Sequence, residues 1–174
     1  MQITIRRINV QDAPALAKMA SQTFYETFTG TCTEKDMQEF LEAYFNIDQV
    51  TKELQNPDDW YFFAEQDGEL AGYLRMMEDY SSFPFMKQWK ALELKRIYVH
   101  KNFHGKGVAQ ALVAFAEKFT QEHQYEVLWL GVWEHNYRAK RFYEKSGFVD
   151  SGFTHSFPIG STPQTDNWMW KFYK

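Results

Sequence analysis

Apolar and polar residues follow two different periods along the first half of the chain. Ile3 and Ile5 alternate with polar neighbours, which is the period-2 pattern of a strand with one buried face. Later apolar residues recur every three or four positions, which indicates amphipathic helices, and Asp67-Gly68 between two apolar runs favours a type I′ hairpin. The elements predicted for this half are a strand at 2–8, a helix at about 12–29, a helix at 34–45 that opens on a capping box from Thr33 to Asp36, a helix at 47–55, and paired strands around 60–63 and 70–77.

The second half of the chain alternates strands with helices. Residues 79–90 have no clean period and are predicted to form a loop held by aromatic side chains. The elements predicted after this loop are a strand at 92–99, a glycine turn with a helix from Gly105 to about His123, a buried strand at 127–132, a helix at 136–146, and strands near 148–157 and 166–173. No repeat or linker interrupts them, so residues 1–174 are expected to form one α/β or α+β domain.

Composition and charge exclude several classes of protein. With 44% hydrophobic and 18% aromatic residues, the chain is expected to fold rather than remain disordered. Its 19 basic and 23 acidic residues give a net charge of −4, which argues against a nucleic-acid partner. The single cysteine, Cys32, cannot form an internal disulfide, and the charged start lacks the apolar run of a secretory signal. No apolar stretch approaches the roughly 20 residues of a membrane span, so we expect a cytoplasmic protein without a membrane partner.

The turn after the predicted strand at 92–99 has the chemistry of an anion site. Gly105 and Gly107 allow backbone amides to converge without obstruction by a Cβ atom, and the helix N-terminus adds a partial positive charge. The segment lacks the Gly-Lys-Ser/Thr of a P-loop, and it lacks the third glycine and the distant acidic residue of a dinucleotide fingerprint. The alternative is a plain strand-to-helix turn that needs glycine only for tight packing.

The helix that follows the buried strand places polar groups along one side. Asn136, Ala139 or Lys140, and Tyr143 are spaced so that they share a helical face, whereas Phe142 lies off that face and can enter the core. On this interpretation the Asn136 amide and the Tyr143 hydroxyl border one groove, two turns apart. The alternative is a surface helix that buries an aromatic pair.

Together these two segments resemble the GNAT superfamily of acetyl-CoA-dependent N-acetyltransferases. The family's Arg/Gln-x-x-Gly-x-Gly/Ala motif is matched by residues 104–109, except that His104 stands where the family has Arg or Gln, which makes its charge pH-dependent. The family's Asn-x-x-Ala-x-x-Phe-Tyr-x-x-x-Gly-Phe motif is matched at every fixed position of 136–148. The resemblance covers 92–150 and implies a GNAT fold, a mixed, twisted sheet of about seven strands with helices on both faces and a V-shaped split between 92–99 and 127–133.

The resemblance also implies direct attack of an amine on the thioester of acetyl-CoA, without a covalent enzyme intermediate. Tyr143 is then the general acid that protonates the departing thiolate, and Glu93 accepts the amine proton directly or through water. The backbone of 97–99 pairs with the pantetheine arm, and the amides of the glycine turn hold the pyrophosphate. The residues implied in binding acetyl-CoA are Ile97, Tyr98, Val99, His104, Gly105, Lys106, Gly107, Val108, Ala109, Asn136 and Lys145.

Several of these assignments have alternatives, and other charged residues are open candidates. Glu93 is equally open to interpretation as a solvated strand carboxylate. His100 and His104 have a metal-like spacing, but they lie in a non-helical stretch without a third ligand, so no metal is expected. The candidates for contacting the 3′-phosphate of the cofactor are Lys106, Arg138, Lys140 and Lys145. The candidates for attracting a cationic acceptor are Glu26, Glu34, Asp36, Glu78, Asp79 and Glu93.

Three functions remain open at this stage. Residues 23–28, 34–45 and 129–134 resemble the bacterial PaiA-type spermidine/spermine N-acetyltransferases, which implies a polyamine as the small-molecule acceptor. The second possibility is another amine, such as a protein N-terminus or an aminoglycoside. The third is an inactive CoA-binding regulatory module, against which the retained Tyr143 argues. Either a monomer or a homodimer is compatible with the sequence.

Overall fold

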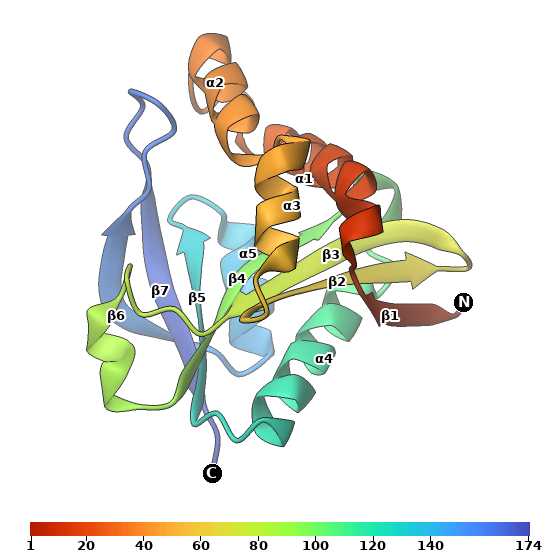
Figure 1. The fold of residues 1–174 in the computed structure, drawn as a ribbon. Helices are drawn as coiled ribbons and strands as arrows, with labels where there is room; N and C mark the ends of the chain where they lie inside the picture. Colours follow the sequence, from red (N-terminus) through yellow and green to blue (C-terminus); the bar gives the residue numbers. More distant parts are fainter.

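The computed structural model describes all 174 residues, and its centre is one seven-stranded sheet (Figure 1). The strands are β1 (Ile3–Arg7), β2 (Asp59–Gln66), β3 (Glu69–Met77), β4 (Ala91–Val99), β5 (Val127–Trp133), β6 (Val149–Ser156) and β7 (Thr165–Phe172). The helices are α1 (Ala13–Phe28), α2 (Glu34–Tyr44), α3 (Ile47–Gln55), α4 (Val108–Glu122) and α5 (Tyr137–Lys145). The predicted mixed sheet of seven strands is confirmed, and none of the helices combines the length and hydrophobicity needed to cross a bilayer.

The sheet has the order β1-β2-β3-β4-β5-β7-β6, in which only β4 and β5 run parallel. Asp67 and Gly68 have φ angles of 52° and 87°, which is the pair of positive values that the predicted type I′ turn between β2 and β3 requires. Gly72 of β3 passes so close to β4 that an added Cβ would lie 2.5 Å from the carbonyl oxygen of Tyr98. The local turn chemistry therefore sets the register of the N-terminal half.

A split opens in the middle of the sheet, between β4 and β5. These strands pair only where Ala91–Glu93 meets Val127–Trp129, and beyond that point they separate. The other edge of β4 stays paired with β3 up to Val99, so the strand keeps its extended form although one side has no partner. The predicted V-shaped split is confirmed, and its open end leads to the glycine turn and α4.

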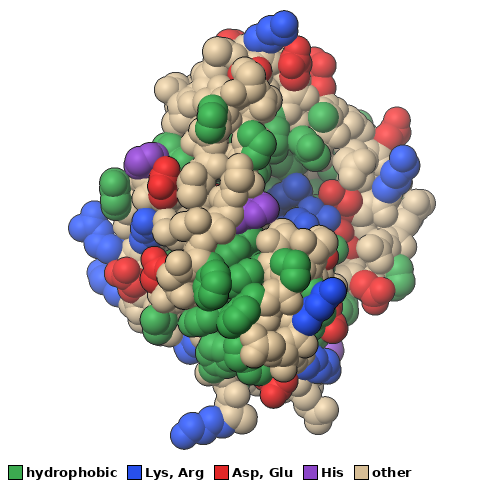
Figure 2. Space-filling view, turned by 90° about the vertical axis from the view of Figure 1, so that its left-hand side faces the viewer, with side chains coloured by type: hydrophobic (Ala, Val, Ile, Leu, Met, Phe, Trp, Pro, Cys, Tyr) green, Lys and Arg blue, Asp and Glu red, His purple; other side chains and the backbone are tan.

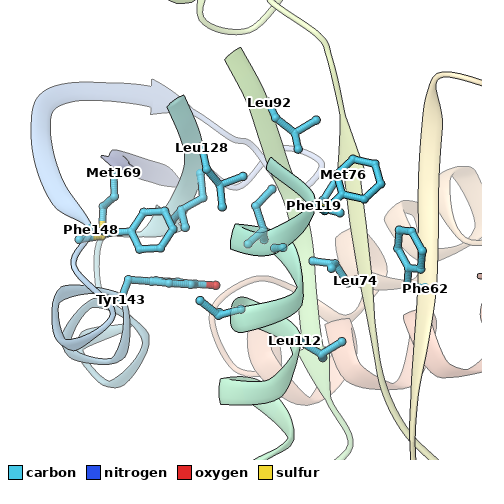
Figure 3. Packing of buried hydrophobic residues seen from close by; sticks show 14 of the residues in the cluster. Phe62, Leu74, Met76, Leu92, Leu112, Phe119, Leu128, Tyr143, Phe148 and Met169 are labelled. Carbon is cyan, nitrogen blue, oxygen red and sulfur yellow. The ribbon is translucent and has the colours of Figure 1, made fainter. Parts of the chain in front are cut away.

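Helices cover both faces of the sheet, each over its own hydrophobic core. On one face α4 packs on a cluster that includes Leu74, Leu92 and Leu128 (Figure 3). On the other face α1 and α3 cover a cluster that includes Tyr61 and Phe63, whose neighbour Phe62 points to the first face because side chains alternate along a strand. A third cluster forms where the loop at 79–90 covers β5 and β7, and it contains Phe83, Met86, Ala91, Val127, Trp129 and Trp168.

Two local expectations need correction. The loop at 79–90 has the expected aromatic anchors, but it also contains a short 3-10 helix at Pro84–Gln88. Thr33 caps α2 as predicted, since its hydroxyl accepts from the Asp36 amide, but the Asp36 carboxylate does not complete a capping box. It accepts hydrogen bonds from Ser161 and Thr162, at 2.8 and 3.0 Å, because the segment between β6 and β7 lies against the start of α2. The long-range contact thus replaces the local one.

Candidate active site

A cavity of about 1050 Å³ follows the split between β4 and β5 and continues over the ends of α1, α2 and β7. The glycine turn, the start of α4 and one side of α5 line one half, which we call the cofactor half. Phe24, Phe28 and Phe157 contribute to an aromatic wall in the other half, which we call the acceptor half. Figure 2 shows a hollowed face on which basic and histidine side chains gather beside hydrophobic ones. One continuous space therefore connects the two halves.

The glycine turn presents a group of unused backbone donors at the cofactor half. Gly105 and Gly107 have φ angles of 75° and 85°, and an added Cβ at either position would have no heavy atom within 4 Å. The amides of Gly105, Gly107, Val108, Ala109 and Gln110 make no hydrogen bond to another backbone group. Five free amides at a helix N-terminus are a binding site for an anion such as a pyrophosphate.

His104 and Lys106, which flank Gly105, were both expected to bind the cofactor, and each contacts another residue of the chain. His104 is exposed, and its Nε2 lies 2.8 Å from the carbonyl oxygen of Val99. The Val99 carbonyl, which was expected to pair with the pantetheine arm, therefore already has a partner. Lys106 does not line the cavity, and its ammonium lies 5.3 Å from the centre of the Phe103 ring. The other cofactor candidates, from Ile97 to Ala109, together with Asn136 and Lys145, line the cavity.

Helix α5 borders the opposite side of the cofactor half. The Asn136 side chain caps this helix by accepting a hydrogen bond of 3.1 Å from the Ala139 amide, so its oxygen is already in use. Tyr143 is 7% exposed and packs against Phe148, yet it also lines the cavity. Figure 3 shows its hydroxyl directed away from α5 toward α4. Burial raises the pKa of Tyr143 well above its ordinary value, which keeps the phenol protonated.

Phe142 does not enter the core as expected for a residue off the Tyr143 face. It is only partly buried, packs against the edge of the core and lines the cavity beside Tyr143. The ring centres of the two residues are 5.3 Å apart. Tyr143, and not Phe142, is therefore the member of this pair that belongs to the buried core.

Glu93 lies on the floor of the cavity and is 5% exposed. Its Oε2 atom is buried and has no hydrogen-bond partner in the protein. Burial raises the pKa of Glu93 to about 7, against the opposing effect of Lys95. The interpretation of Glu93 as a solvated strand carboxylate is therefore wrong. A carboxylate that titrates near neutral pH inside a cavity has the properties of a general base.

Basic side chains of α5 line the cofactor half, where a phosphate would meet them. Arg138 and Lys145 line the cavity as candidates for the 3′-phosphate, whereas Lys140 lies 5.7 Å from the Tyr137 ring centre and points elsewhere. Arg141 also lines the cavity, and sequence reasoning missed it. Arg141 follows Arg138 by three residues, so the two share a helical face, and this spacing could have identified Arg141 from the sequence.

The acidic candidates divide clearly between the cavity and the rest of the surface. Only Glu26 and Glu93 of the six line the cavity. Glu34 accepts hydrogen bonds from Tyr25 and Gln38, and Glu78 from Tyr80 and Tyr125, outside the cavity. Asp79 forms an ion pair with Lys95 at 3.6 Å. Asp166 of β7 also lines the cavity, and it was missed because its strand was predicted without regard to which face it buries.

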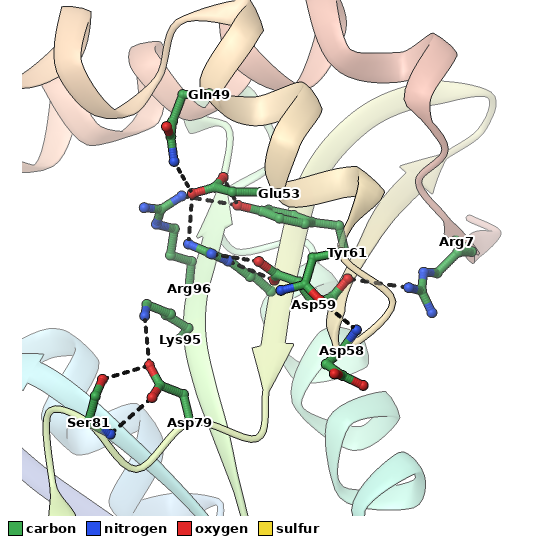
Figure 4. A network of polar contacts seen from close by, with 12 residues as sticks. Arg7, Gln49, Glu53, Asp58, Asp59, Tyr61, Asp79, Ser81, Lys95 and Arg96 are labelled. Carbon is green, nitrogen blue, oxygen red and sulfur yellow. Dashed lines mark hydrogen bonds and ion pairs between the residues drawn. The ribbon is translucent and has the colours of Figure 1, made fainter.

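A buried ion network holds the acceptor half in place (Figure 4). Arg75 is 5% exposed and donates to both carboxylate oxygens of Asp59, at 2.9 and 2.6 Å, and its third nitrogen lies 3.3 Å from Glu53 of α3. Tyr61 donates to Glu53 at 2.8 Å and accepts from Arg96 at 3.2 Å. The network ties α3 to β2, β3 and β4, and it fixes Arg96, which lines the cavity.

The two histidines with metal-like spacing point to separate partners. Nε2 of His100 lies 3.1 Å from the Gln22 amide nitrogen, and its Nδ1 accepts from the Asn102 amide. His104 contacts the Val99 carbonyl instead, and no group of three or more metal-ligating side chains occurs in the chain. The two imidazoles therefore do not converge on one point.

The sheet is thus split between two parallel strands, and free amides at a helix N-terminus lie beside the split. The chain belongs to the acetyltransferase (GNAT) family, which it matches over residues 18–148. An uncharacterized N-acetyltransferase from the pepI 3′ region of Lactobacillus delbrueckii subsp. lactis is 36% identical over 164 residues, 94% of each chain. The protein is accordingly an acyltransferase of the N-acetyltransferase type.

More distant relatives include proteins with named substrates. A spermidine N(1)-acetyltransferase from Thermoplasma acidophilum is 23% identical over 152 residues, covering 85% of this chain and 89% of that protein. The crystal structure of PaiA N-acetyltransferase from the same organism, in complex with coenzyme A, superposes with a TM-score of 0.80 at 21% identity, covering 99% of this chain and 100% of that chain. At this identity the likeness establishes the fold.

Proposed function

We propose that this protein transfers the acetyl group of acetyl-CoA to a primary amine of a polyamine such as spermidine or spermine. The observation that carries the proposal is Glu93, a buried carboxylate without a partner at the floor of a cavity that continues to five free amides. An unpaired buried carboxylate costs stability, and such perturbed groups cluster at functional sites, so its presence in the cavity supports a role in the chemistry.

The cofactor half fits acetyl-CoA by its donors and its shape. The free amides from Gly105 to Gln110 would hold the pyrophosphate, and Arg138, Arg141 and Lys145 are placed for further phosphate oxygens. The open edge of β4 at 97–99 faces the split, where an extended pantetheine arm would lie. Acetyl-CoA supplies an activated thioester, and the protein supplies orientation and proton transfer.

Two side chains would handle the protons of the reaction. An alkylammonium, with an ordinary pKa of about 10.4, must lose a proton before it attacks, and Glu93 is the acceptor of that proton. When the carbon–sulfur bond breaks, the thiolate leaves with the electron pair, and the Tyr143 hydroxyl donates a proton to it. Tyr143 then recovers a proton from solvent. Burial of Tyr143 keeps its phenol protonated, as a general acid requires.

The acceptor half favours a cationic substrate. Glu26, Glu93 and Asp166 line it, together with an aromatic wall that includes Phe24 and Phe28. Aromatic faces attract ammonium groups, and carboxylates pair with them. The spermidine acetyltransferase among the relatives supports the same acceptor class. The cations in this half are engaged, since Lys95 pairs with Asp79 and Arg96 donates to Tyr61.

The test is the release of CoA thiol from acetyl-CoA with a panel of acceptors. The panel contains spermidine, spermine, a simple monoamine, an aminoglycoside and a peptide with a free N-terminus. We expect the highest kcat/KM with spermidine or spermine. If the peptide or the aminoglycoside is acetylated and the polyamines are not, the proposed acceptor class is wrong. If CoA binds but no amine is acetylated, the protein is a regulatory CoA-binding module.

Glu93→Gln tests the role of the base in the same assay. Its pKa of about 7 means that the carboxylate gains its ionised form as pH rises through 7, so wild-type kcat/KM should rise over that interval. The variant should lose about 10²-fold or more in kcat, and the inflection near pH 7 should vanish. Glu69→Gln, at an exposed position that begins β3, is the control for the change in charge. An unchanged inflection in Glu93→Gln would remove Glu93 from the mechanism.

The same pKa makes a prediction for stability. Burial favours the protonated form of Glu93 in the folded state, so folding binds a proton between pH 4.5 and 7. The free energy of unfolding should therefore fall as pH rises from about 4.5 to about 7, by on the order of 3 kcal/mol for this group, and level off above that. Denaturant unfolding at pH 5 and pH 8 should show a smaller difference for Glu93→Gln than for the wild type.

A further inference from the structure

Asp166 is a carboxylate of the acceptor half without a partner of its own. It lies on β7 and lines the cavity, and burial alone shifts its pKa, with no ion-pair or hydrogen-bond partner contributing. An added Cβ at Gly131 would lie 3.1 Å from Oδ2 of Asp166. The lack of a side chain at Gly131 therefore makes room for this carboxylate. Burial raises the pKa of Asp166 to about 6, and it remains ionised at neutral pH.

The neighbours of Asp166 suit an ammonium group. In the sheet register Asp166 stands directly opposite Trp133 of β5 on one side and His155 of β6 on the other. Both neighbours line the cavity, and the Trp133 Nε1 atom is buried without a hydrogen-bond partner. Burial and Lys95 lower the pKa of His155, so the imidazole is neutral and does not compete for the carboxylate. An ionised carboxylate beside an indole ring is a binding site for a cation.

Asp166 and Glu93 lie on the same face of the sheet, and the strand register gives the separation of their Cα atoms. Glu93 pairs with Trp129, and Trp129 pairs with Trp170, which places these side chains on one face. Asp166 lies four residues before Trp170 on β7 and so shares that face. With strands about 4.8 Å apart and a rise of about 3.3 Å per residue, the two Cα atoms are roughly 16 Å apart. The two side chains shorten this span, because both line the same cavity.

We propose that Asp166 binds a second ammonium group of the acceptor, while the reacting amine lies at Glu93. The enzyme then prefers long diamines and polyamines to monoamines of the same length. A short diamine does not span the separation, whereas an extended triamine such as spermidine does. This inference rests on the proposed function and adds to it the residue that determines which amines are preferred.

The experiment compares two acceptors of equal length, 1,7-diaminoheptane and n-heptylamine, by thiol release with acetyl-CoA. Asp166→Asn should raise the KM for the diamine by about tenfold to a hundredfold, which is the usual worth of a hydrogen bond to a charged group. The KM for heptylamine and the kcat for both amines should stay within about threefold, because Asp166 does not contact the reacting amine. The KM for 1,3-diaminopropane should behave like that of the monoamine.

The matched control is Asp58→Asn, which removes the same charge from an exposed aspartate that does not line the cavity. Its KM values should equal those of the wild type. If Asp166→Asn does not fold, as judged by circular dichroism, Asp166→Ser carries the same prediction with a smaller neutral side chain. Asp166→Glu should restore part of the preference for the diamine, which a purely structural role would not do.

The outcomes separate this inference from the proposed function. If the wild type acetylates no amine, the proposed function itself fails. If the wild type acetylates amines but Asp166→Asn raises the KM for diamine and monoamine equally, or changes neither, the Asp166 subsite is overturned and the proposed function stands. A wild type that does not distinguish heptylamine from 1,7-diaminoheptane overturns the subsite as well.

Discussion

The two halves of the cavity are built in different ways. In the cofactor half the binding groups are backbone amides of one short segment, from Gly105 to Gln110, followed by basic residues of one helix. In the acceptor half the polar groups are side chains from α1, β4 and β7, namely Glu26, Glu93 and Asp166, which are far apart in the sequence. The polar groups of one half thus come from one continuous segment and its helix, whereas those of the other half are side chains that different elements bring together.

The halves also differ in what holds them. The cofactor half needs only two glycines with positive φ and the start of α4, since amide donors point outward at any helix N-terminus. The acceptor half depends on buried long-range contacts, such as the Arg75 network under Arg96 and the Asp36 contacts to the segment between β6 and β7. We therefore expect changes in one half to leave the other largely intact.

The largest effect is expected at Tyr143, which lines the cavity from α5. Tyr143→Phe keeps the ring packing but removes the proposed proton donor, and general acid catalysis is typically worth about 10² to 10⁴ in rate. We expect kcat to fall by that amount, with little change in the KM for acetyl-CoA. Steady-state thiol release measures both constants. Tyr137→Phe on the same helix, with a side chain that is 60% exposed, should keep the wild-type rate. A Tyr143→Phe rate within about threefold of the wild type would mean that water supplies the proton.

Gly107→Val should impair the cofactor half alone. Gly107 has a φ of 85°, so valine there is strained, and its side chain would crowd the free amides. We expect the Kd for CoA to rise by about tenfold or more, as measured by calorimetric titration. Gly68→Val is the matched control, because Gly68 has a φ of 87° and equal free space but lies on the β2–β3 turn. Equal effects of the two variants on the Kd would show that strain, and not the amides, weakens binding.

The smallest effect is expected at Asp36, which acts on the acceptor half from a distance. Asp36→Ala removes the hydrogen bonds from Ser161 and Thr162 and frees the segment that carries Phe157 over the cavity. The KM for the acceptor should rise by about threefold, near the worth of one hydrogen bond, and the Kd for CoA should not change. Asp48→Ala removes an exposed aspartate from the first turn of α3 and serves as control. A change in the Kd for CoA would contradict the independence of the halves.

Most of the fold could be predicted because its signals are local. The helix at 47–55 has the bounds that its pattern predicted, and Asp67-Gly68 forms the predicted turn, because backbone preferences act over a few residues. The capping box predicted at Thr33 was correct for the Thr33 hydroxyl but wrong for the Asp36 carboxylate, because a distant contact outweighs the local one. The Asp36 carboxylate has better donors in Ser161 and Thr162, which the sequence places more than a hundred residues away. Tertiary contacts override a weak local preference whenever they satisfy a buried group better.

The candidate site divides along the same line. The sequence by itself determined the glycine turn at 104–109, which we propose binds an anion, and the place of Tyr143 beside the cavity, since glycine, helix start and residue spacing are properties of a continuous segment. Only the tertiary structure decided that Glu93 is buried without a partner and that Asp166 shares its cavity. It also decided that Lys106 and Asp79 are engaged elsewhere. Burial and pairing depend on which strands become neighbours, and the order of strands in a sheet arises from the packing of the whole chain.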